Sequence, residues 1–105
     1  MVGRIWHGYT TPERANVYFN LLKSEVLPGI AAMNIPGYKS IQVLRRDLGE
    51  EVEFITIMWF DSVENIKAFT GEDSEVAHVP PNARKVLKRF DARSQHYELI
   101  KELHY

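Results

Sequence analysis

Residues 52–60, VEFITIMWF, have the composition of a β-strand that is apolar on both of its faces. Side chains point to alternate faces along a strand. One face carries Phe54, Met58 and Phe60, and the other carries Ile55, Ile57 and Trp59. A strand that is buried on one side only alternates apolar and polar residues, and this strand does not. The sheet that contains it must therefore be covered twice, and a chain of 105 residues can cover it only once by itself.

The rest of the chain predicts the elements around this strand. In order, they are a strand over 3–9, a helix over 12–27, strands over 38–46 and 51–61, a helix over 63–69 and a strand over 92–103. Thr11 and Pro12 are suited to a helix start, and Pro28 with Gly29 predicts a kink or an interruption of that helix. A further helical turn is expected over 30–33, before the breaker at 34–37. Short helical turns are expected over 73–78 and 82–90.

The order β-α-β-β-α-β is that of the ferredoxin-like α+β fold, a four-stranded antiparallel sheet with both helices on one face. The other face of the sheet then remains bare. Because a large exposed apolar face normally marks an interface, we expect a homodimer in which two sheets pack face to face. The alternative is a monomer that tolerates the bare face. The length predicts one domain over 1–105.

The composition excludes several classes of function. The net charge of −1 gives no general attraction to nucleic acid or to an anionic membrane surface. There is no cysteine, so disulfides and thiolate sites are excluded, and a cytoplasmic location is expected. No apolar run is long enough to span a bilayer, and the start MVGRIWHG lacks the layout of a signal peptide.

Two segments carry a resemblance to a known family: TIMWFDSVENIKAFTGEDSEVAHV over 56–79, and ARSQHYELI over 92–100. A strand that ends in Trp, an Asp-Ser pair at a helix start, a late helical aromatic and a following His make up the pattern. With these elements the chain resembles the antibiotic biosynthesis monooxygenase-like family of dimeric α+β barrels. The resemblance implies one such domain, and it covers nearly the whole chain in the order of elements.

The resemblance implies two kinds of activity. Some members of the family are cofactor-independent monooxygenases that act on aromatic polyketides and quinols, and others degrade heme. The heme-degrading branch uses an Asn on the first strand, a Trp late in the second helix and the His that follows. Here the His position resembles His78, but Phe69 stands at the Trp position and His7 at the Asn position. Heme degradation therefore lacks two of its three residues, while heme binding stays open.

His78 is the candidate catalytic residue, because an imidazole titrates near neutral pH and can act as a general base. The alternative is a histidine that caps a helix end or bonds a carbonyl. Trp59 and Phe69 are candidate walls for a flat substrate, and the alternative for Trp59 is an anchor in the core or the dimer interface.

His7 and Tyr97 are further candidates for substrate binding, on the first and last strands. Tyr97 could give a proton to a bound oxygenated intermediate. More often, a tyrosine on a strand packs its ring against neighbours and exposes its hydroxyl to water. No metal site is expected, because the histidines show no HxH or HxxxH spacing. Phosphate-binding glycine loops, Ser-His-Asp spacing and paired catalytic carboxylates are also missing.

The leading hypothesis is a cofactor-independent monooxygenase-like enzyme that acts on a small aromatic or quinol substrate, with no cofactor required. A non-enzymatic, ligand-binding or stress-related dimeric barrel is one alternative, and a heme-binding or heme-degrading relative is the other. In each case the partners are a second copy of the chain and a small apolar or aromatic ligand.

Overall fold

The computed structural model describes residues 1–105 and contains an antiparallel sheet of the predicted α+β, ferredoxin-like type. The strands are β1 (Val2–Thr10), β2 (Tyr38–Asp47), β3 (Val52–Phe60), β4 (Arg89–Phe90) and β5 (Gln95–Glu98). Their order is β2-β3-β1-β4, and β5 also pairs with β1. Together β4 and β5 take the place of one fourth strand beside β1.

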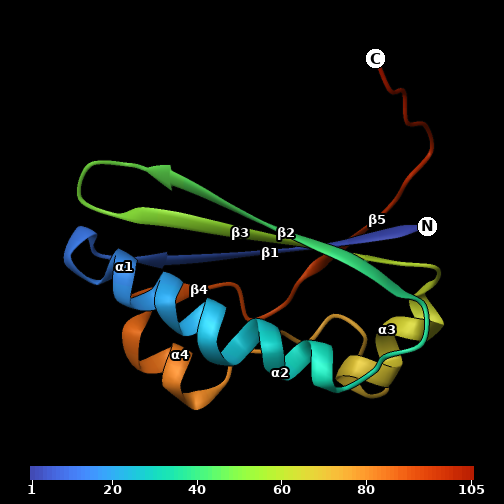
Figure 1. Cartoon of the computed structure of the whole chain (residues 1–105), viewed down its shortest axis with the longest axis horizontal. Helices are drawn as coiled ribbons and strands as arrows, with labels where there is room; N and C mark the ends of the chain where they lie inside the picture. Colours follow the sequence, from blue (N-terminus) through green and yellow to red (C-terminus); the bar gives the residue numbers. More distant parts are fainter.

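All the helices cover the same face of the sheet (Figure 1). They are α1 (Pro12–Leu21), a π-helical turn η1 (Leu22–Val26), α2 (Leu27–Ala32), α3 (Val63–Thr70) and α4 (Pro81–Val86). Gly71 has a φ of +91° and ends α3 as predicted. No helix combines the length and the apolar character that crossing a bilayer requires.

The first helix continues past Pro28 instead of breaking there. Proline has no N–H to give to the carbonyl four residues earlier, and its ring crowds that carbonyl. The helix accommodates this by widening into the π turn just before Pro28, where the N–H of Leu27 bonds the carbonyl of Leu22. The predicted interruption is thus a local change in hydrogen bonding, and one continuous helical rod lies across the sheet.

The C-terminal third departs further from the prediction. Residues 73–78 form a turn and a loop rather than a helix, and the helix expected over 82–90 ends at Val86. The strand expected over 92–103 is limited to β5. It starts late because residues 92–94 pair with the loop after α3 instead of with β1, and it ends early because Glu98 already lies opposite Val2, the first residue of β1. Val76 forms a bridge with Arg93, and Ser94 N–H donates to the carbonyl of Glu75 at 2.7 Å.

The two faces of β3 are confirmed. Phe54, Met58 and Phe60 are buried beneath the helices, while the face with Ile55, Ile57 and Trp59 has no layer over it. The buried face supports two apolar clusters. One contains Trp6, Tyr18, Leu22 and Phe54, and the other contains Ile30, Met58, Ile66 and Phe69. A pocket lies where these two clusters meet.

Candidate functional site

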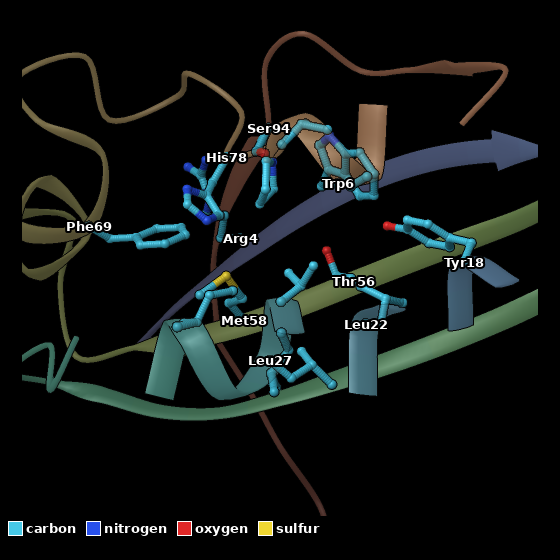
Figure 2. A pocket seen from close by; sticks show the side chains of 16 residues that line it. Arg4, Trp6, Tyr18, Leu22, Leu27, Thr56, Met58, Phe69, His78 and Ser94 are labelled. Atoms are coloured by element: carbon cyan, nitrogen blue, oxygen red, sulfur yellow. The ribbon is translucent and has the colours of Figure 1, made fainter. Parts of the chain in front are cut away.

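A pocket opens between the sheet and the helical rod, at the seam of the two apolar clusters (Figure 2). Its empty space is about 500 Å³ when the open mouth is included, so the enclosed part is smaller. Sixteen residues line it and eleven of them are hydrophobic, which is typical of a site for a small apolar ligand. Its polar side chains are few, and they decide what it can bind.

His78 lies at the mouth of the pocket, on the loop between α3 and α4. Its ring packs on Phe69, with ring centroids 4.8 Å apart. The residue is exposed overall, but the surrounding protein removes enough water from the ring to lower its pKa, and the positive charge of Arg4 lowers it further. His7 and His96 hydrogen-bond other side chains, whereas the ring of His78 makes no hydrogen bond. The cap or carbonyl contact of the alternative interpretation is therefore absent.

Arg4 provides a buried positive charge beside His78. It points from β1 toward the helices, is only 2% exposed, and lines the pocket. Its guanidinium donates to the carbonyls of Ser74 and Val76, contacts His96 at 3.0 Å and lies 5.6 Å from the ring centroid of Phe69. Burial lowers the pKa of Arg4 to about 10, and nearby Glu75 opposes that shift, so the group remains a cation at neutral pH.

Three pocket residues, Tyr18, Thr56 and Ser94, carry hydroxyls that make no hydrogen bond to the protein. Tyr18 and Ser94 are each only 2% exposed. No fully buried side-chain oxygen or nitrogen in the structure lacks a partner, so these two hydroxyls border the open space of the pocket. An unpaired hydroxyl away from bulk water costs roughly 1–3 kcal/mol. The pocket is thus apolar, with a few hydroxyls that have no partner within the protein.

Of the five residues predicted for the site, the structure brings only His78 and Phe69 together. Trp59, His7 and Tyr97 lie on the uncovered face of the sheet. There the indole of Trp59 donates to Gln42 at 2.9 Å, and His7 contacts the carboxylate of Glu53 at 3.0 Å. Tyr97 is 57% exposed. Trp59 therefore lies outside the pocket, on the face of the sheet that no layer covers.

Three pocket residues, Arg4, Tyr18 and Ser94, are not among those that the sequence predicts. The sequence could have identified Arg4, because alternation along β1 puts it on the same buried face as Trp6. An arginine is rarely buried unless other groups bind its charge. Tyr18 was indistinguishable from the apolar stripe of its helix. No local pattern in the sequence identifies Ser94, because its position depends on the division of the last strand into β4 and β5. No group of three His, Asp or Glu side chains is close enough to hold a metal ion.

No protein-family model matches the chain, and no curated protein matches it in sequence. Solved structures do match it in fold. A "putative antibiotic biosynthesis monooxygenase" from Bacillus cereus has a TM-score of 0.70 at 13% identity, covering 99% of this chain and 97% of its own. The heme-degrader MhuD from Mycobacterium tuberculosis, with two hemes bound in its active site, has a TM-score of 0.60 at 21% identity, covering 99% and 100%.

A third structure, described as a dimeric ferredoxin-like protein from an uncultured marine organism, has a TM-score of 0.56 at 14% identity and covers 99% of this chain and 98% of its own. At these identities the likeness concerns the fold. The chain therefore has the fold of antibiotic biosynthesis monooxygenase-like proteins, as the resemblance in its sequence predicts.

Proposed function

We propose that the protein is a cofactor-independent monooxygenase-like enzyme that oxidises a small aromatic or quinol substrate, with His78 as general base. The proposal depends on the position and the protonation of His78. Its imidazole borders an apolar pocket, makes no hydrogen bond to the protein and has a lowered pKa. A neutral imidazole with a free ring nitrogen is what proton abstraction at neutral pH requires.

In the proposed reaction His78 takes the proton of a phenolic hydroxyl on a ring that lies against Phe69. The cation of Arg4 favours the resulting phenolate, because it is buried in the same pocket. For a hydroquinone, O₂ then adds at a ring C–H carbon to form a hydroperoxide, which loses water to give a hydroxyquinone. One oxygen atom enters the product and the other leaves as water. The substrate supplies all four electrons, so no external reductant is needed.

Oxygen uptake with hydroquinones and naphthols tests the proposal. We expect uptake above the buffer rate, one ¹⁸O atom from ¹⁸O₂ in each product, and a loss of roughly 10²- to 10⁴-fold in His78→Gln. His104→Gln is the matched control, since His104 lies in the exposed C-terminal tail. Uptake that is equal in wild type and His78→Gln would refute the role of His78. Ligand binding without any uptake would instead favour a non-enzymatic binding protein.

Heme binding is the second candidate function, and the same free imidazole supports it. His78 and Phe69 are the residues that would hold the heme, and the iron would supply O₂ binding and activation when bound. Heme degradation is not part of this proposal, because the pocket side of β1 carries Arg4 and Trp6 rather than an Asn. Titration with hemin should give a Soret band that His78→Ala shifts or removes. The absence of any such band would eliminate heme binding.

We also propose that the chain works as a homodimer, with the uncovered faces of two sheets packed together. Ile5, Ile55, Ile57 and Trp59 share that face with Leu44, which is 50% exposed. The C-terminal tail leaves the molecule on the same side (Figure 1), where Ile100 is 88% exposed. Apolar groups in this number, exposed on one side, are typical of a surface that a second copy covers.

A further inference from the structure

The proposed proton abstraction leaves the three pocket hydroxyls without a role. They come from three separate parts of the chain: Tyr18 from α1, Thr56 from β3, and Ser94 from the segment between β4 and β5. Each faces a pocket that is otherwise mainly apolar. Hydroxyls at buried positions normally hydrogen-bond to another protein group or to an ordered water molecule. Their lack of protein partners indicates that they are satisfied by what enters the pocket.

Tyr18 is the best defined of the three. Its ring is held edge-on against Phe54, with centroids 4.9 Å apart, and the residue is only 2% exposed. Because the ring is fixed by packing, the hydroxyl is fixed too. Burial raises the pKa of this phenol, so it stays protonated and available as a hydrogen-bond donor.

The polar groups are divided between two ends of the pocket. Figure 2 shows Tyr18 well separated from His78, with the Tyr18 hydroxyl directed toward the middle of the pocket and the Thr56 hydroxyl between the two. Ser94 and Arg4 lie at the His78 end. Between the ends the walls include Leu22, Met58 and the ring of Trp6. A ligand that satisfies this arrangement is flat and apolar in the middle, and polar at both ends.

We infer that the substrate is an elongated aromatic compound with an oxygen at each end, one hydroxyl placed at His78 and Ser94 and a second oxygen accepting the hydrogen bond of Tyr18. Thr56 supplies a further polar contact along the ring. The inference rests on the proposed function in one respect, namely that the reacting hydroxyl lies at His78. A fused-ring diol or hydroxyquinone has this shape, whereas a simple phenol reaches only one end.

Calorimetric titration with two matched probes, naphthalene-2,6-diol and 2-naphthol, tests the inference without turnover when carried out anaerobically. The probes share a ring system and differ in the second oxygen. We expect the wild-type protein to bind the diol about tenfold more tightly, the size of one good hydrogen bond. Tyr18→Phe should remove this preference by weakening the diol alone. Tyr9→Phe is the control, since the Tyr9 hydroxyl donates to Glu53 on the opposite face of the sheet.

The inference is overturned if the wild-type protein binds both probes equally or binds neither, or if Tyr18→Phe keeps the full preference for the diol. Thermal unfolding of Tyr18→Phe checks that the core is intact. The isosteric Thr56→Val alters a contact along the ring that both probes share, so it should leave the preference for the diol unchanged. The proposed function fails separately: a diol preference that depends on Tyr18, in a protein that consumes no O₂, supports this site and refutes the monooxygenase.

Discussion

The guanidinium of Arg4 donates to the backbone carbonyl of Val76 at 2.6 Å, two residues before His78. A second bond, of 2.5 Å, reaches the carbonyl of Ser74. No carboxylate hydrogen-bonds this buried cation, so the carbonyls of the loop take that place. One side chain of the first strand therefore fixes the loop that presents His78 to the pocket.

Replacing Arg4 should destabilise the fold and disturb the site together. In Arg4→Met the side chain keeps much of its apolar volume but loses every donor, leaving the carbonyls of Ser74 and Val76 poorly satisfied. We expect the free energy of unfolding to fall by about 2–4 kcal/mol, as measured by urea denaturation. Oxygen uptake should fall as well, because the loop no longer holds His78 in place.

Arg14→Met is the matched control for this change. Arg14 also donates to a backbone carbonyl, that of Lys85 at 3.2 Å, but it does so on the exposed surface. Its replacement should change the free energy of unfolding by no more than about 0.5 kcal/mol. If the two variants lose the same free energy of unfolding, the buried hydrogen bonds of Arg4 do not fix the loop over 74–78.

Replacing each of two glycines by alanine should change the free energy of unfolding in opposite directions. A Cβ at Gly8 would lie 2.5 Å from the ring of Trp6, and that ring is held by its N–H bond to the carbonyl of Asp91. We expect Gly8→Ala to cost about 1–3 kcal/mol through overpacking. Gly29 lies within α2 with no atom near its missing Cβ, so Gly29→Ala should add about 0.5–1 kcal/mol. Thermal unfolding of both variants measures the difference, and a shared sign would contradict the argument.

Local patterns in the sequence were sufficient to predict the frame of the molecule. Alternation along 52–60 assigned Met58 and Ile57 to opposite faces, and both assignments are confirmed. Helix-end signals predicted the bounds of α3 to within a residue. These features depend on neighbours in the chain, and periodicity reports them directly.

The interior of the pocket depends instead on contacts between distant segments. Ser94 reaches it because residues 92–94 pair with the loop over 75–77, a pairing that no local pattern encodes. The place of Trp59 at the end of the strand predicts a wall of the pocket, but the alternation of side chains along β3 puts it on the uncovered face with Ile57. Choosing between the two faces required knowing which one the helices cover.

Charging the uncovered sheet face should separate the proposed dimer without unfolding the protomer. In Ile57→Glu the carboxylate would lie in the centre of that face, where burial without a partner is unfavourable. We expect sedimentation at micromolar concentration to change from a dimer in the wild type to a monomer in the variant. Val17→Glu makes the same chemical change on the helical side, where Val17 is 54% exposed, and should remain dimeric. A wild-type monomer would refute the dimer outright.

The lowered pKa values of His78 and His96 predict how stability depends on pH. Both are held below the ordinary value of 6.5, by burial first and by Arg4 second. Between the lowered values and 6.5 the unfolded chain binds more protons than the folded one. Stability should therefore fall as the pH drops through this window, and this contribution should become constant below the folded pKa values. Glu53 and Asp73 have lowered pKa values as well, but they titrate in a more acidic range.

The same shift fixes the pH profile of the proposed reaction. A base must be neutral to accept a proton, so kcat/KM for oxygen uptake should be flat from about pH 7 upward and should decline toward acid with a midpoint below 6.5. Measurement between about pH 5 and 8 keeps the carboxylates ionised, so the decline of kcat/KM toward acid (the acidic limb) reports the histidine alone. His78→Gln should remove the limb from whatever activity remains, while His104→Gln should keep it. A midpoint above 6.5 would mean that the site favours the imidazolium, which the adjacent cation of Arg4 opposes, and His78 would then not be the base.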